Sequence, residues 1–264
     1  MRTGFLGAGH IARALAEGWR QPLSDPALRP VLLTYDPMPG RARSLAADFD
    51  ARVCGSVAEL VAGCDAVVLA MRPPDVASAL AEVASVLEGR PLLSLAAAVP
   101  LDDLRAGLLP GARVARVMPN VAAAIGCGVF LLSAGTLTAS QADEVRNLFS
   151  LAGTVVDVPE GLFDPATAVA GCGPGFAALF IEALAEAGVE AGLDETMARE
   201  LAVAGVAGAA ALVARDGDPV GVRDAIATPG GMSADGIDVL ACWGMRAALA
   251  AAVAAAVERA RRAR

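Results

Sequence analysis

A glycine-rich segment near the start of the chain has the spacing of a loop that binds a dinucleotide. Residues Gly7–Ala12 read G-x-G-x-x-A and lie between an apolar run and a helical pattern. In such a loop Gly7 permits a tight turn, Gly9 lets the backbone approach a pyrophosphate, and Ala12 allows close helix packing. The alternative is that the glycines only make a turn. The predicted cofactor-binding residues of this loop are Gly7, Ala8, Gly9, His10 and Ile11.

The second predicted strand ends at a carboxylate that could read the adenosine ribose. Asp36 follows the apolar run Val31–Tyr35, and an acid at this point accepts from ribose hydroxyls and repels a 2′-phosphate. Arg41 and Arg43 lie just downstream and could instead neutralise a phosphate, and Asp36 could be only a turn residue. The sequence therefore favours NAD slightly over NADP.

Other candidate site residues follow predicted strands, because ligands of open α/β sheets lie beyond the carboxyl ends of the strands. Small residues after the fifth strand would let a flat nicotinamide lie against the backbone. Asn120, after the sixth strand, could bind a ligand or hold its own loop. Arg72 could attract a carboxylate or be a solvated residue at a strand end. The cofactor-binding residues predicted here are Ala70, Met71, Arg72, Pro73, Ala96 and Ala97.

The second half of the chain contains two further glycine clusters, at residues 171–175 and 228–233. The second cluster precedes a predicted helix, so its N–H groups and the positive end of the helix could hold a small anion. Ser233 adds a hydroxyl that can donate or accept a hydrogen bond. An ordinary turn with a capping serine is the alternative.

The shortage of proton donors limits the chemistry. All 21 basic residues are arginines, and the chain has one histidine, His10, and one tyrosine, Tyr35. His10 in the loop would face the pyrophosphate, far from the reacting ring. Ketone reduction usually needs a strong acid beside the carbonyl, whereas a protonated imine already carries its positive charge. The sequence therefore favours C=N reduction.

Two predicted domains would position these residues. Residues 1–158 alternate apolar strands with helices, which predicts a Rossmann-type doubly wound parallel α/β sheet covered on both faces. Residues 159–264 are rich in alanine and glycine and predict an all-helical domain. Helices with such small side chains often need a partner subunit to bury enough surface.

Composition excludes several classes of function. The net charge of −8 with no basic block argues against nucleic acid and anionic membrane surfaces. Five scattered cysteines and one histidine predict neither a disulfide framework nor a metal site. No continuous spanning segment or signal peptide is evident. We expect a soluble, cytoplasmic protein.

Taken together, the motifs resemble those of pyrroline-5-carboxylate reductases, and the resemblance covers nearly the whole chain. The order and spacing of the motifs are specific, although no single motif is. The matching segments are Gly4–Gly9, Leu69–Pro73, Arg116–Asn120, Gly171–Pro174, Phe180–Ala183 and Thr228–Ser233.

The resemblance implies NAD(P)H-dependent reduction of a cyclic imine acid to proline. It also implies a homodimer through the C-terminal helices, often assembled into a ring of dimers. The Pro-Gly-Gly loop of the family binds the substrate carboxylate, and its terminal hydroxyl, here the catalytic candidate Ser233, meets the ring nitrogen. The predicted substrate-binding residues are Gly230, Gly231, Met232, Ser233, Cys172 and Asn120.

Several positions depart from the family pattern. Ala170 and Cys172 stand where serines are usual, and the bulkier Met232 precedes Ser233. These departures favour, as an alternative, a paralogue that reduces a six-membered or substituted cyclic imine. A second alternative is a nucleotide-binding paralogue that has lost turnover.

Overall fold

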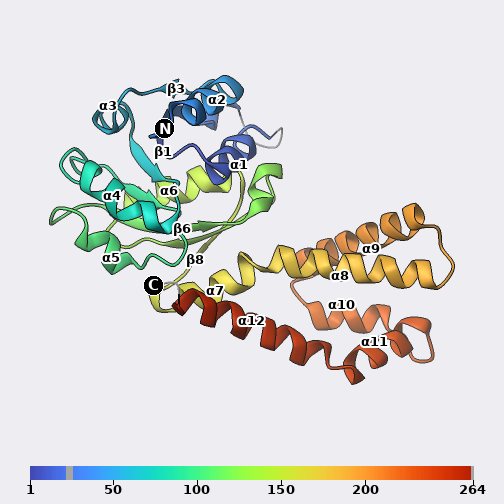
Figure 1. Cartoon of the computed structure of the whole chain (residues 1–264). Helices are drawn as coiled ribbons and strands as arrows, with labels where there is room; N and C mark the ends of the chain where they lie inside the picture. Colours follow the sequence, from blue (N-terminus) through green and yellow to red (C-terminus); the bar gives the residue numbers. More distant parts are fainter. Residues whose placement is uncertain (22–25, 263–264) are drawn as a thin grey trace. The chain divides into compact units, whose positions relative to one another are not determined.

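The computed structural model describes residues 1–21 and 26–262 (Figure 1). Its first half contains an eight-stranded sheet with the order β3-β2-β1-β4-β5-β6-β7-β8. The order reverses at β1, as in doubly wound nucleotide-binding folds. The strands are β1 (Arg2–Leu6), β2 (Val31–Tyr35), β3 (Arg52–Val53), β4 (Ala66–Leu69), β5 (Leu92–Ser94), β6 (Val114–Pro119), β7 (Gly128–Ser133) and β8 (Gly153–Asp157).

Helices cover both faces of this sheet and bury two apolar clusters. Three of them pack on one face: α1 (His10–Gly18), α2 (Pro39–Phe49) and α6 (Ala139–Ser150). Three others pack on the opposite face: α3 (Val57–Gly63), α4 (Pro73–Val83) and α5 (Leu101–Ala106). Short 3-10 turns occupy η1 (Pro26–Leu28), η2 (Val121–Ile125) and η3 (Glu160–Leu162). The strands are apolar on both sides because both sides are buried.

One pairing departs from the parallel sheet that the sequence predicts. Strands β6 and β7 are antiparallel, with Arg116 opposite Ser133, whereas the other strand pairs of the described sheet are parallel. The segment between β6 and β7 contains only η2. A parallel crossover needs a dozen or more residues, so this short connection forces the chain to reverse direction.

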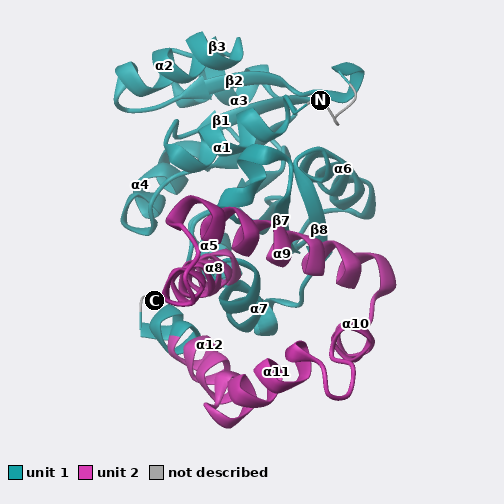
Figure 2. Ribbon diagram, turned by 90° about the vertical axis from the view of Figure 1, so that its right-hand side faces the viewer, with its two compact units in different colours: residues 1–172, 256–264 teal, residues 173–255 magenta. Residues whose placement is uncertain are grey.

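The second half of the described chain is helical, as predicted. The helices are α7 (Phe163–Ala170), α8 (Gly173–Glu190), α9 (Glu195–Asp216), α10 (Pro219–Ile226), α11 (Met232–Cys242) and α12 (Met245–Arg262). Contacts divide the chain into two compact units, and residues 173–255 form the second (Figure 2). Helix α7 therefore belongs to the first unit, although the sequence places the domain boundary near Pro159. Its early Phe163 is buried in that unit.

Large apolar side chains are exposed throughout the second unit, including Leu179 and Leu201. By length and composition alone, two helical stretches, Glu160–Glu190 and Glu195–Asp216, could cross a membrane. A bent pair, α11 with α12, would make a third. The sequence predicts no continuous spanning segment, so these stretches depart from that expectation. Exposed apolar surface of this extent indicates that another surface covers it.

Candidate functional site

The turn after β1 has the geometry that the glycine motif predicts. Gly7 has φ +102°, and a Cβ atom there would lie 2.5 Å from the carbonyl oxygen of Ala70. The N–H of Gly7 donates to the carbonyl of Tyr35 at 2.8 Å. Gly9 has open space where its Cβ would be, and it directly precedes the first residue of α1. The backbone here can therefore approach a ligand at the N-terminus of α1.

Asp36 is buried and holds this turn in place. One carboxylate oxygen accepts from the N–H of Ala8 at 2.9 Å, and the other accepts from the N–H of Met38 at 2.8 Å. The carboxylate thus links the glycine loop to the segment before α2. A carboxylate oxygen can accept more than one hydrogen bond, so both oxygens retain lone pairs for a ribose hydroxyl.

A cleft of about 920 Å³ lies beside the glycine loop and gathers most of the predicted cofactor residues. Of the predicted residues, those that line it are Gly7, Ala8, Gly9, His10, Ile11, Asp36, Ala70, Met71 and Arg72. Residues from three segments far apart in the sequence therefore share one concave surface. Such a cleft at the reversal point of an open sheet is the usual nucleotide site.

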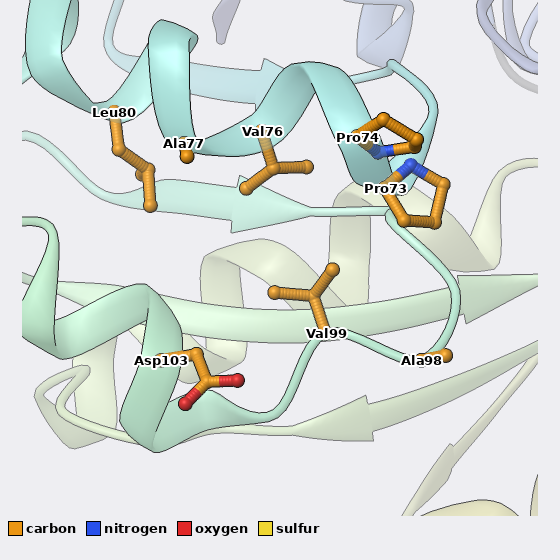
Figure 3. Close-up of a pocket in the computed structure, with 8 residues that line it drawn as sticks. All are labelled: Pro73, Pro74, Val76, Ala77, Leu80, Ala98, Val99 and Asp103. Carbon is orange, nitrogen blue, oxygen red and sulfur yellow. The ribbon is translucent and has the colours of Figure 1, made fainter. Parts of the chain in front are cut away.

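The remaining predicted cofactor residues lie elsewhere. Pro73 lines a separate hollow of about 370 Å³ between the start of α4 and the loop after β5 (Figure 3). Ala98 and Val99 line the same hollow, and Ala98 has φ +59°, a conformation that alanine rarely adopts. Ala96 and Ala97 line neither the cleft nor the hollow among the described residues.

Three arginines line the cleft. Arg13 pairs with Asp48 and lies over the ring of Phe49, while Arg72 pairs with Asp75 at 3.3 Å and is largely exposed. Arg41 also lines the cleft, from the first turn of α2. Arg13, Met38 and Ser44 also line the cleft, although no motif marks them in the sequence. Helical spacing was the available signal for Arg13 and Ser44, because each lies one turn into a helix that begins at the cleft.

Asn120 is buried and hydrogen-bonded to the backbone on both sides. Its amide nitrogen donates to the carbonyl of Ala170 at 3.0 Å, and its oxygen accepts from the N–H of Val129 at 3.1 Å. The sequence allows Asn120 either to bind a ligand or to hold its own loop. In this structure the side chain holds its own loop. It also fixes the end of α7.

The second unit presents the 228–233 cluster as a turn that leads into α11. Gly230 has φ +77°, and the N–H of Gly231 donates to the carbonyl of Thr228 at 2.9 Å. Gly231 is the N-cap, so the N–H groups of Met232 and Ser233 begin the first helical turn. Neither N–H group has an acceptor among the described residues. Two donors of the predicted anion site are therefore free, whereas that of Gly231 is used by the turn.

Cys172 lies two residues after the end of α7, and its thiol is free and half-buried. Its neighbour Gly171 is tightly packed, since a Cβ there would lie 2.8 Å from the carbonyl oxygen of Thr167. The thiol can donate only a weak hydrogen bond. Among the described residues, no group of histidine, cysteine or acidic side chains could hold a metal ion.

Two family profiles match the chain. Residues 160–263 match a profile described as pyrroline-5-carboxylate reductase dimerisation, and residues 2–98 match one described as NADP oxidoreductase, coenzyme F420-dependent. The first match covers the helices with exposed apolar surface, which indicates that the chain forms a dimer.

Similar proteins share nearly the full length. A pyrroline-5-carboxylate reductase of Mycobacterium leprae is 36% identical, with 97% of this chain and 94% of that protein covered. One from Methanosarcina acetivorans is 34% identical, with 98% and 96% covered. A solved reductase of Coxiella burnetii is 25% identical with a TM-score of 0.91, covering 99% of this chain and 97% of that one. The Plasmodium falciparum pyrroline carboxylate reductase with NADP bound has 27% identity, a TM-score of 0.84 and coverage of 98% and 97%. The chain belongs to the pyrroline-5-carboxylate reductase family.

Proposed function

We propose that this protein uses NAD(P)H to reduce the C=N bond of a cyclic imine acid, 1-pyrroline-5-carboxylate, to L-proline. The observation that carries the proposal is the cleft beside the glycine loop in a chain of this family. The residues fit a dinucleotide, since Gly7 makes the turn, Gly9 leaves room for a pyrophosphate and α1 begins beside it. The bound nicotinamide would supply the hydride.

The protein's own contribution is to bind and orient the imine. The free N–H groups of Met232 and Ser233, with that of Gly230, would hold the substrate carboxylate at the positive end of α11. The hydroxyl of Ser233 would orient the ring nitrogen. A cationic imine needs no further acid in the hydride step, which agrees with the lack of lysine and the single histidine.

The direct test mixes purified protein, pyrroline-5-carboxylate and NADH or NADPH, and follows absorbance of the reduced cofactor while proline is quantified. We expect oxidation of one equivalent of cofactor for each proline formed. Binding of the cofactor without turnover of any cyclic imine would instead identify an inactive nucleotide-binding paralogue.

Ser233→Ala tests the catalytic assignment. We expect the KM for the imine to rise about tenfold, because a hydrogen bond to a charged ligand is lost. Ser140→Ala, at an exposed helical position in the first unit, is the matched control. Unchanged kcat and KM in Ser233→Ala would remove this hydroxyl from the site.

For the cofactor, we propose a modest preference for NADH. The Asp36 carboxylate lines the cleft and would repel a 2′-phosphate, whereas Arg41 would attract it. Asp36→Asn should move the preference toward NADPH, and Arg41→Ala should raise the KM for NADPH about fivefold with little change for NADH. A higher kcat/KM with NADPH in the unaltered protein would contradict the proposed preference.

A larger ring is the second candidate substrate. Ala170 and Cys172 near the end of the first unit, and the 94% exposed side chain of Met232, motivate it. Comparing kcat/KM for five-membered and six-membered imine acids separates the two. A preference for the six-membered ring would overturn the assignment to proline formation.

We also propose that a second copy of the chain covers the exposed helices in place of lipid, that dimers assemble into a ring, and that the protein is cytoplasmic. Sedimentation without detergent tests the first two points, and fractionation of cells tests the third. Recovery only in the membrane fraction would contradict this proposal.

A further inference from the structure

An ion pair between a buried arginine and a half-buried glutamate lies at the carboxyl edge of the sheet, outside the cleft. Arg116 on β6 is 2% exposed, and its guanidinium donates to Glu160 at 2.5 Å. The ring of Phe163, at the start of α7, lies 4.1 Å from the guanidinium carbon. Such a pair is costly to desolvate, so it contributes little net stability over an apolar packing of the same volume. Stability alone therefore does not explain why the Arg116–Glu160 pair is present.

The Glu160 carboxylate has a second partner in another segment. The same oxygen that binds Arg116 accepts from the N–H of Leu101 at 3.0 Å. Leu101 is the first residue of α5, whose N-cap, Pro100, has no side chain that could cap the helix. Glu160 thus caps α5 from a position 59 residues away in the chain.

The Leu101 N–H that Glu160 binds lies at the end of the loop after β5. It contains Ala96 and Ala97, the predicted nicotinamide-facing residues, and Ala98 with its strained φ of +59°. An alanine keeps such a conformation only where its surroundings enforce it. The bond to the Leu101 N–H fixes the far end of that loop.

Contacts at both ends of α7, the helix that follows Glu160, hold this segment in place. Phe163 buries the start of α7 against Arg116, and Asn120 binds the carbonyl of Ala170 at the end of α7. Burial raises the pKa of Glu160, but the Leu101 N–H, the Arg116 guanidinium and the Ser133 hydroxyl lower it below its ordinary value. The carboxylate therefore stays charged at neutral pH.

We propose that Glu160 is a positioning residue that, held by Arg116, fixes the loop after β5 so that its backbone can receive the nicotinamide ring. This inference rests on the proposed function. Because Glu160 orders the loop before the cofactor binds, the entropic cost of cofactor binding is lower.

The test compares Glu160→Ala, which loses the bonds to Arg116 and to the Leu101 N–H, with Glu160→Gln, which keeps an acceptor for the Leu101 N–H. Asp157→Asn is the matched control, because Asp157 forms an exposed ion pair with Arg146. The first readout is hydrogen exchange of residues 96–101 in the cofactor-free protein. The second is the Kd for NADH by fluorescence titration, and the third is the separation of KM from kcat.

We expect Glu160→Ala to exchange these amides about tenfold faster and to raise the Kd and KM for NADH about tenfold, with a smaller fall in kcat. Glu160→Gln should recover part of each change. If Glu160→Ala does not fold, the same loop exchange, Kd and KM are compared between Glu160→Gln and Asp157→Asn. Larger changes in Glu160→Gln support the inference, and equal values overturn it.

A lower unfolding temperature with Kd, KM and loop exchange equal to those of Asp157→Asn would overturn the inference. Failure of the proposed reaction is distinguishable. In that case the unaltered protein would not reduce the imine, while loop exchange and NADH affinity would still respond to Glu160.

Discussion

At the residue scale, the two glycines of the nucleotide loop have different physical reasons to be glycine. Gly7 has no room for a Cβ and has a positive φ, whereas Gly9 has an ordinary φ of −82° and open space. The protein's own packing therefore requires Gly7. Only a ligand that approaches the backbone closely would require Gly9.

Substituting alanine at each position distinguishes the packing requirement at Gly7 from the ligand requirement at Gly9. Gly7→Ala should lower the free energy of unfolding by at least about 2 kcal/mol, because the new Cβ meets the Ala70 carbonyl at a strained φ. Gly9→Ala should leave that free energy within about 0.5 kcal/mol but raise the Kd for NADH roughly tenfold or more. Denaturant unfolding and fluorescence titration measure the two effects. An unchanged Kd in Gly9→Ala would place the pyrophosphate elsewhere.

A buried thiol gives the protein a defined sensitivity to alkaline pH. Burial raises the pKa of Cys64 to about 11 from the ordinary value of 9.0, although Arg90 opposes the shift. The folded state binds this proton more tightly than the unfolded state. The stability contribution is therefore complete below pH 9 and is lost as the pH rises to about 11.

We expect the free energy of unfolding to fall by about 2–3 kcal/mol across this pH range, from 1.36 kcal/mol per pKa unit. Urea unfolding at a series of pH values measures the fall, and Cys64→Ala is the control that should flatten it. In native protein at pH 8, iodoacetamide should label the exposed Cys127 and spare Cys64. Equal labelling of both thiols would show that Cys64 is accessible.

At the element scale, local sequence signals set the start of α6. Thr138 accepts from the N–H of Gln141 at 3.2 Å, and the Gln141 side chain accepts from the N–H of Thr138 at 3.0 Å. This reciprocal pair satisfies donors that the helix would leave free. The helix then packs Val145 and Phe149 into the core.

Thr138→Ala should lower the free energy of unfolding by about 1 kcal/mol, the usual cost of losing an N-cap side chain. Ser140→Ala, exposed two residues later, should change it by less than about 0.5 kcal/mol. Thermal or urea unfolding measures both. A loss in Ser140→Ala as large as in Thr138→Ala would show that loss of the cap does not explain the change.

Helix α7 shows where local signals failed. In the second half of the chain the sequence predicts helices only from about Phe176 onward, so α7 is not among them. Proline is tolerated in the first turn of a helix, where its missing N–H is not needed. Pro165 is the third residue of α7, so it starts the helix without breaking it.

At the scale of the whole molecule, the apolar helices of the second unit need a partner. Leu179 on α8 and Leu201 on α9 are 63% and 58% exposed in the single chain. These helices fall within the profile match for dimerisation. We propose that this exposed apolar area becomes buried in the dimer.

Charge placed on this surface should oppose dimer formation. Leu179→Glu with Leu201→Glu should shift the protein toward monomer, since burying an unpaired carboxylate is unfavourable. Leu109→Glu, at an exposed leucine of the first unit, is the control and should stay dimeric. Light scattering after gel filtration measures the mass. A mutant pair that remains dimeric would move the interface away from these leucines.

The sequence by itself determined the order of the strands and of most helices, the glycine turn and the all-helical second half. These features depend on hydropathy period, glycine and proline, which act over a few neighbouring residues. Only the tertiary structure decided the antiparallel β6–β7 pair and the backbone bonds of Asn120 and Asp36. It also decided the cap that Glu160 places on α5. Each of these joins groups far apart in the chain, and their meeting depends on how the sheet brings those segments together.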